Sequence, residues 1–501
     1  MDLHITSFSF LTTFFIFISI ALKLWKRPSK NLPPGPRKLP LIGNIHQLAT
    51  DLPHRRLTEL AKTYGPVMHI QIGQIPAVII SSAELAKKVL KTEELMFLER
   101  PFLLAADIML YNRTGITFAP YGDYWREMKK IVTLEVLTAK RVKSFRSIRE
   151  KEVSNFVQYL HSKGGSPVDL TSELLGLTNS IIAISTTGKK CKKQDEIIGV
   201  IADAIEAAGG FSIAEAFPSF GLLPKITGMS SLLRRIHQKA DEILEEIINE
   251  HKAIRATLKS KIESDNILDV LLDIQEHGEL QFNLTTDNIK AMTLEMLGAA
   301  TDTSSVTTQW AISELMKNPS VMKKAQEEIR RVCRGKTTVD EEDIRELKYL
   351  KLIIKETFRL HPPVPLIPRE CLGTCQLNGY VIYPKTRVLV NAGAIGKDPK
   401  IWDDPERFYP ERFVDSSIEF KGNDFELIPF GAGKRICPGI TMVMANVELM
   451  IAHMLYHFDW KMPDEAKSES IDMSESFGLA IKRKTNLILV PIPYEPIVEG
   501  I

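Results

Sequence analysis

The sequence predicts a mainly α-helical domain with small β-sheets, preceded by one transmembrane helix. Three observations support this prediction. Long stretches of helical periodicity fill the middle of the chain, apolar β-branched runs lie near its two ends, and an uncharged apolar run lies close to the start. No repeat or low-complexity linker divides the 501 residues, although that length alone favours two or three domains. We therefore expect an anchor over 1–30, a proline-rich hinge over 31–40 and one folded domain over 41–501.

The composition limits the classes of protein to which the chain can belong. Its 64 Lys and Arg residues nearly balance 62 Asp and Glu residues, whereas a nucleic-acid binder shows a strongly basic face. The five cysteines are odd in number and scattered, so they predict a reducing compartment and no disulfide framework. Cys371 and Cys375 have the spacing of a metal-binding pair. No second pair or histidine cluster completes a zinc site, so this alternative is disfavoured.

The predicted anchor covers Ile5–Leu22, which holds no charge and would be about 27 Å long as a helix. Basic residues follow it at once, so the positive-inside rule places the rest of the chain in the cytosol. The alternative is a cleaved secretory signal, but its basic residues would precede the apolar run, and no small-residue cleavage site is present. We expect a single-pass protein of the endoplasmic reticulum membrane, in contact with the lipid bilayer. The basic residues are Lys23, Lys26, Arg27 and Lys30.

The remaining elements follow from periodicity and from glycine and proline breaks. The stretch Leu32–Pro36 is too rich in proline to continue a helix. Thr286–Lys317 contains no proline and predicts one helix of about 48 Å, which Asn318 and Pro319 end. We further expect a hairpin over Gln71–Ser81, helices over Ala139–His161 and Ser231–Leu258, and strands at Val381–Ile382, Val388–Val390 and Leu487–Val490.

The ten residues Phe430–Gly439, FGAGKRICPG, are the most informative segment of the chain. Glycine lets a backbone approach a flat group closely, and a cysteine thiolate is a known axial ligand of haem iron. The other interpretation is a buried structural cysteine. The segment resembles the haem-binding signature F-x-x-G-x-R-x-C-x-G of the cytochrome P450 family at every fixed position. The resemblance implies haem b (iron protoporphyrin IX) with Cys437 as axial ligand, contacted by Phe430, Gly433, Arg435 and Gly439.

A second motif lies near the middle of the predicted long helix, at Gly298–Ser304. An acid beside an alcohol can relay protons, although an Asp-Thr pair also occurs in ordinary solvated turns. The segment resembles the family's A/G-G-x-D/E-T-T/S motif, which assigns the proton relay to Asp302 and Thr303. It departs from the motif at Ala300, where the family usually has glycine. We expect the extra methyl group to narrow the oxygen groove.

Two further motifs predict the scaffold of the haem site. Glu356 and Arg359 stand at i and i+3 on one helix, a spacing that alone is common in surface ion pairs. They resemble the family's E-x-x-R element, and Pro410–Phe413 resembles its P-E-R-F element. The resemblance implies a triad of Glu356, Arg359 and Arg412. A near-duplicate at Pro405–Phe408 is the alternative third partner.

Cations are expected around the acidic propionates of the haem. Trp125 and Lys129 share a helix face at i and i+4, where the family often has W-x-x-x-R. Lys129 keeps the positive charge of that arginine but cannot form its bidentate pair of hydrogen bonds. Arg369 and Arg435 are the other candidates, and the direction of Arg126 stays open.

The resemblance also implies which segments line the substrate pocket. These segments carry few charges, which favours an apolar substrate, although each side chain alone is more typical of an ordinary core than of a specificity determinant. Residues 207–227 are rich in Phe and Leu and are expected to contact the membrane. The expected lining residues are Leu103, Ile108, Met109, Leu294, Gly298, Ala299, Val364, Leu366, Ile367, Phe477, Leu479 and Ala480.

The motifs fall in the family's order along the whole chain, which resembles the plant microsomal members that oxidise terpenoids and alkaloids. This implies a haem-thiolate monooxygenase that uses O2 and NADPH. Electrons would come through NADPH–cytochrome P450 reductase, with cytochrome b5 as a further candidate donor, docking on basic residues such as Lys130 and Lys434. The expected substrate is a sesquiterpene or diterpene, and the alternatives are an alkaloid or phenylpropanoid. Two other classes are a reductase-independent haem isomerase or dehydratase, and a non-enzymatic haem carrier.

Overall fold

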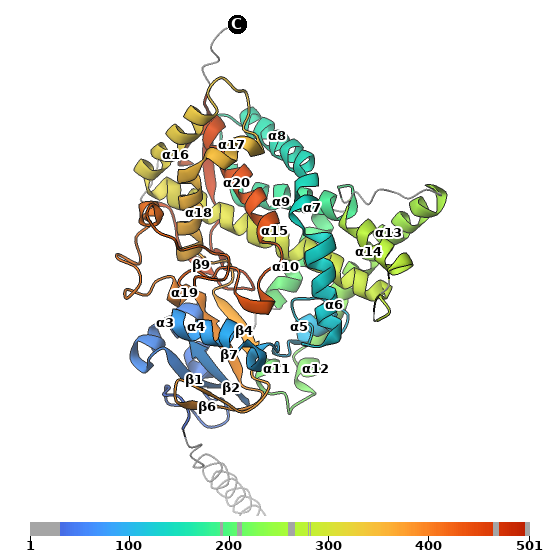
Figure 1. The fold of residues 1–501 in the computed structure, drawn as a ribbon, viewed down its shortest axis with the longest axis vertical. Helices are drawn as coiled ribbons and strands as arrows, with labels where there is room; N and C mark the ends of the chain where they lie inside the picture. The colour runs from blue at the N-terminus through green and yellow to red at the C-terminus, as the bar shows by residue number, and fades with distance from the viewer. Residues whose placement is uncertain are drawn as a thin grey trace, which may run out of the picture.

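The computed structural model describes residues 31–190, 194–207, 213–258, 266–278, 280, 282–463 and 470–495. Within these ranges helices make up most of the molecule, and the strands form small sheets, as predicted (Figure 1). The expected anchor over 1–30 lies outside the described residues. Among the helices that are described, none combines the length and the apolar character needed to cross a membrane.

The largest sheet has the strand order β1-β2-β7-β4 and lies at one end of the molecule (Figure 1). The predicted hairpin is confirmed, with its first strand starting earlier than expected, and β2 pairs in parallel with β7. The proline-rich stretch lies alongside β1, where the His69 amide donates to the Pro34 carbonyl at 2.8 Å. The strands are β1 Val67–Ile72, β2 Ile75–Ile80, β3 Val168–Asp169, β4 Leu366–Glu370, β5 Cys375–Leu377, β6 Tyr380–Ile382, β7 Arg387–Asn391, β8 Phe458–Lys461, β9 Glu475–Ser476, β10 Lys482–Arg483 and β11 Ile488–Pro493.

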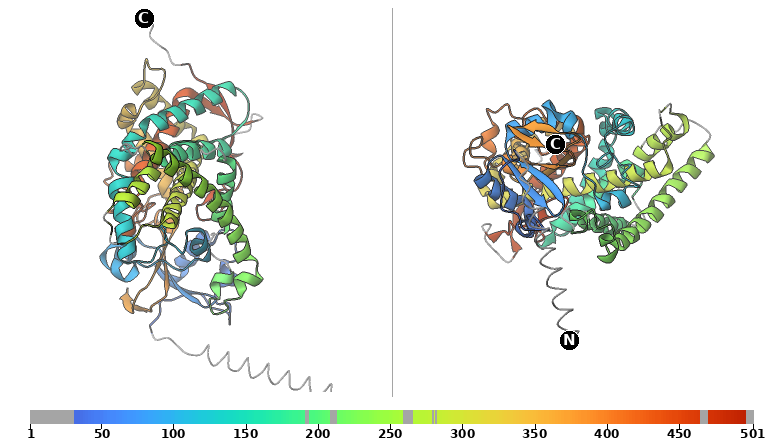
Figure 2. Two further views of the ribbon diagram at one scale, coloured as in Figure 1. Left: turned by 90° about the vertical axis from the view of Figure 1, so that its right-hand side faces the viewer. Right: turned by 90° about the horizontal axis from the view of Figure 1, so that it is seen from below.

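The helix α15, Thr286–Lys317, has the bounds that the sequence predicts. Thr285 and Asn288 form a reciprocal capping box at its start, and Asn318 caps its end just before a proline. The helix crosses the middle of the molecule and packs against α9 and α20, whereas α13 and α14 form a lobe on one side (Figures 1 and 2). Nearly all of its side chains are therefore buried or face the cavity described below.

The other helices surround α15. They are α2 Ile45–Leu48, α3 Pro53–Tyr64, α4 Ala83–Lys87, α5 Leu104–Met109, α6 Asp123–Ile131, α7 Ala139–Ser144, α8 Arg146–Ser162, α9 Leu170–Thr187, α10 Gln194–Ala207, α11 Ile213–Ala216, α12 Leu223–Ile226, α13 Met229–Leu258, α14 Ile267–His277, α16 Pro319–Val332, α17 Glu341–Glu346, α18 Lys348–Leu360, α19 Ala392–Ile395 and α20 Ile440–His457.

The prediction of one helix over Ala139–His161 is wrong. The structure has two helices, α7 and α8, which meet at Phe145 with φ −83° and ψ 6°. The bend lets the Phe145 ring and the Arg149 guanidinium both enter the interior, where Arg149 donates to the Val142 carbonyl at 2.8 Å. Helical periodicity does not reveal such a bend, because both halves keep the same apolar spacing.

Candidate active site

The loop that carries Cys437 is a tight turn that leads directly into α20. The Cys437 amide donates to the Phe430 carbonyl at 3.0 Å, and the Gly439 amide donates to the Cys437 Sγ at 3.3 Å. Gly433 has φ +71°, and a Cβ atom there would lie 1.9 Å from the Leu90 carbonyl oxygen. Only glycine fits this position, as its place in the predicted motif requires. Burial raises the pKa of the Cys437 thiol, so a bound metal ion would have to displace its proton.

Four cationic side chains lie buried or half-buried near this loop: Lys129, Arg100, Arg369 and Arg435. Their donors contact backbone carbonyls; for example, Lys129 Nζ donates to Ile436 O at 2.9 Å, and none of the four forms an ion pair within the described part of the chain. Burial lowers the pKa of Arg369 to about 9 and of Lys129 to about 8. A cluster of buried positive charge without carboxylate partners suits a doubly anionic ligand.

Trp125 holds this cluster in place. Its Nε1 donates to the Ile116 carbonyl at 2.9 Å, and the Arg435 guanidinium lies 4.4 Å from its ring centroid. Arg126, whose direction the sequence left open, is exposed and pairs with Asp123.

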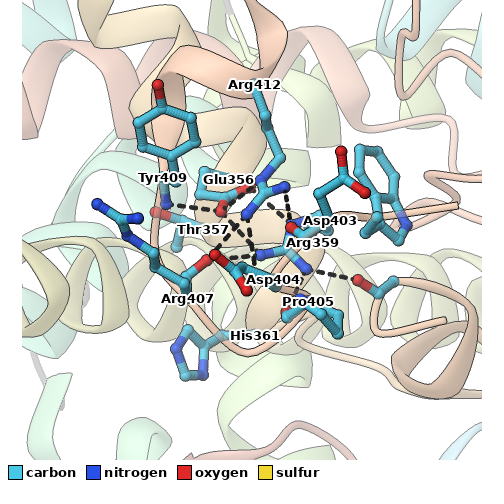
Figure 3. Close-up of polar contacts among 12 residues, drawn as sticks. Glu356, Thr357, Arg359, His361, Asp403, Asp404, Pro405, Arg407, Tyr409 and Arg412 are labelled. Carbon is cyan, nitrogen blue, oxygen red and sulfur yellow. Dashed lines mark hydrogen bonds and ion pairs between the residues drawn. The ribbon is translucent and has the colours of Figure 1, made fainter. Parts of the chain in front are cut away.

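Glu356, Arg359 and Arg412 form one buried network (Figure 3). Arg359 donates to the Glu356 carboxylate through Nε at 2.7 Å and Nη2 at 2.8 Å, and Arg412 Nε donates to it at 3.0 Å. The Tyr409 amide adds a fourth hydrogen bond at 2.8 Å. The structure thus brings Arg412 to the glutamate, whereas the Arg407 guanidinium of the near-duplicate segment lies over the Tyr409 ring. The network fixes α18 to the chain around residue 410.

A cavity of about 410 Å³ lies between the Cys437 loop and α15, and its wall is mainly apolar. Nine of the twelve expected lining residues contact it: Leu103, Met109, Leu294, Gly298, Ala299, Val364, Ile367, Leu479 and Ala480.

The other three expected lining residues do not contact the cavity. Leu366 precedes Ile367 on β4, so it points to the opposite face of the sheet and packs toward α3 and β1. Ile108 packs into the core beside α13 instead of into the cavity, and Phe477 stacks on His54 with ring centroids 5.8 Å apart. In each case the sequence identified the right segment but not the direction of the side chain.

Four polar residues of α15 reach the cavity wall: Glu295, Asp302, Thr303 and Thr307. Thr303 Oγ1 donates to the Ala299 carbonyl at 2.7 Å, and Asp302 forms an ion pair with Lys482. Glu295 was missed by sequence reasoning. Its carboxylate accepts the amides of Ile116 and Thr117, and burial raises its pKa to about 7.

The family model for cytochrome P450 matches residues 33–490. The chain belongs to the cytochrome P450 family. It is 55% identical over 498 residues to cytochrome P450 726A27 of Euphorbia lathyris, with 99% of each chain covered. It is 48% identical to a melianol synthase of Azadirachta indica, covering 99% of this chain and all of the relative, and 49% identical to a premnaspirodiene oxygenase of Hyoscyamus muticus, covering 97% and 98%. A zebra fish cytochrome P450 structure with progesterone has a TM-score of 0.75 at 24% identity, with 88% and 99% covered, and so shares the fold.

This P450 is therefore a monooxygenase, and its family implies a haem held by a cysteine thiolate. The residues fit that group. Cys437 presents its sulfur to the cavity beside two φ-positive glycines, and the cluster of unpaired cations matches two propionate groups. Lys129, Arg369 and Arg435 were expected in this role. Arg100 was not, because it lies in a loop where sequence reasoning weighed only apolar side chains.

Proposed function

We propose that this P450 oxidises an apolar terpenoid in the membrane of the endoplasmic reticulum, with electrons from NADPH through a reductase. The observation that carries the proposal is the apolar cavity that joins the Cys437 sulfur to Asp302 and Thr303. A carboxylate or sugar substrate would find few partners on such a wall. Plant relatives that act on terpenoids, the melianol synthases and the premnaspirodiene oxygenase, support the same substrate class.

Each part of the site has a separate task in this proposal. The haem, when bound, supplies oxygen activation and the transfer of one oxygen atom to a C–H or C=C bond. Leu103, Leu294 and Leu479 orient the substrate and exclude water from it. Asp302 and Thr303, which lie on the cavity wall, bring protons to the cavity.

Expression of the full chain with a plant reductase in yeast microsomes tests the proposal. A panel of sesquiterpenes, diterpenes, alkaloids and phenylpropanoids should yield NADPH-dependent oxygenated products from a terpenoid. The Cys437→Ala variant should lose both the products and the haem-thiolate absorbance of the reduced CO complex. Oxidation of alkaloids alone would reject the proposed substrate class. Conversion without NADPH would reject the proposed reductase. Resistance of the protein to alkaline extraction from the microsomes checks the membrane anchor over 1–30.

A further inference from the structure

One ion pair links the interior of the active site to the protein surface. Lys482 Nζ lies 2.6 Å from Asp302 Oδ1. The lysine side chain is 37% exposed, whereas the aspartate side chain is 7% exposed and contributes to the cavity wall. The pair therefore has one end in solvent and the other at the cavity.

The ion pair is not needed to attach the β9–β10 hairpin that carries Lys482. Arg483 Nη1 donates to Ser313 Oγ at 2.8 Å, and Trp310 Nε1 donates to the Ile481 carbonyl at 3.0 Å. Both contacts are buried and fix the residues on either side of Lys482 to α15. The hairpin would thus keep its place without the lysine, which points to a role for its charge other than docking.

The proton-relay pair is separated in this structure. Within the described residues no hydrogen bond joins Asp302 to Thr303, because the carboxylate pairs with Lys482 and the threonine hydroxyl donates to the Ala299 carbonyl. Asp302 must leave the lysine before it can donate toward the cavity. Among the described groups, Lys482 is the charged side chain that acts on Asp302, and it opposes the effect of burial, which raises the pKa of the carboxyl.

The same hairpin also contacts the substrate space. Its turn places Leu479 and Ala480 on the cavity wall, only two residues before Lys482. The ion pair and the substrate space therefore share one hairpin, in which Ile481 and Arg483 are both held to α15.

We infer that Lys482 is a positioning residue that holds Asp302 ionised and away from Thr303 between successive proton transfers. The carboxylate takes up a proton from bulk solvent, which neutralises it and releases it from the lysine. It then donates this proton to the Thr303 hydroxyl as the hydroxyl donates its own hydrogen to the cavity. This inference rests on the proposed relay role of Asp302 and Thr303, and adds the residue that returns Asp302 to its ionised form after each transfer.

The test compares three variants of the full-length holoenzyme with its reductase: Lys482→Met, Lys482→Arg and Lys484→Met. Lys484 is the matched control, because it lies two residues along, is 60% exposed and is 3.8 Å from Asp51. We expect Lys482→Met to lower the product formed per NADPH about ten-fold, while the other two stay near the parent. The substrate-induced spectral shift should keep the same apparent affinity in all three.

Infrared difference spectroscopy gives a readout that does not depend on turnover. Without the lysine, the buried Asp302 carboxylate loses its counter-charge and takes up a proton. A protonated carboxyl C=O band should appear at neutral pH in Lys482→Met and disappear in the double variant with Asp302→Asn.

The outcomes separate this inference from the proposed function. If Asp302→Asn leaves coupling unchanged, the relay itself is wrong. If Asp302→Asn uncouples but Lys482→Met behaves like Lys484→Met and shows no carboxyl band, the relay stands and the role of Lys482 is refuted. If neither Lys482→Met nor Lys482→Gln incorporates haem, the lysine is structural, which also overturns the inference.

Discussion

Removal of the Glu356 carboxylate should strongly destabilise the haem-side core. Glu356 and Arg359 side chains are both 0% exposed, and the carboxylate accepts two hydrogen bonds from Arg359, one from Arg412 and one from the Tyr409 amide. Glu356→Ala leaves a guanidinium buried without its counter-charge. Breaking such a pair costs about 3–5 kcal/mol, a large part of the about 5–15 kcal/mol by which proteins are stable.

The assay is urea unfolding of the purified protein together with the haem content per polypeptide. Glu59→Ala is the matched control, because Glu59 pairs with Arg56 at the same i,i+3 spacing but is 62% exposed. That exposed pair should contribute less than about 1 kcal/mol. We expect Glu356→Ala to unfold at much lower urea and to incorporate little haem, and Glu59→Ala to match the parent. If the two variants unfolded at the same urea concentration, the argument from burial would be refuted.

Three further substitutions test individual features of the site. Gly433→Ala should abolish haem incorporation, because its Cβ would meet the Leu90 carbonyl at 1.9 Å, and a normal reduced-CO spectrum would contradict this. Glu295→Gln should remove a pH dependence: since burial raises the pKa of Glu295 to about 7, its contribution to stability is complete below about pH 4.3 and is lost as pH rises through 7. The free energy of unfolding, plotted against pH over that range, should fall in the parent and stay level in the variant. Parallel plots for the two proteins would disprove the assignment. Gly298→Ala should fold normally, since among the described residues its Cβ meets Ile201 alone, at 3.5 Å. It should nevertheless turn over the larger terpenoids of the panel more slowly, and unchanged selectivity would show that this wall does not limit substrate size.

Local chemistry made much of the architecture predictable. The bounds of α15 follow from a proline-free stretch between a capping threonine and Asn318-Pro319, signals that act within a few residues. The bend at Phe145 was not predictable, because it depends on where the Phe145 and Arg149 side chains are buried in the folded molecule. The direction of Leu366 was missed for a related reason: the register of a strand is set by its partners.

The site shows the same division between local and long-range information. Cys437 and its glycines lie within ten residues, so their spacing carried the prediction. Arg100, Glu295 and Lys482 acquire their roles through contacts with distant segments, such as the Glu295 carboxylate with the Ile116 amide. Lys482 sits in a run of basic residues that gives no hint that one of them faces Asp302. Only the packing of the β9–β10 hairpin on α15 distinguishes it from its neighbours.

The parallel pairing of β2 with β7 has a consequence for biosynthesis. Val78 lies opposite Val388, so the ribosome must add about three hundred residues before this register can form. The Cys437 loop and the Leu479 turn are translated later still. Until then, apolar surfaces that will enclose the haem are open to solvent and to chaperones. The haem site can therefore form only after nearly the whole polypeptide has been made.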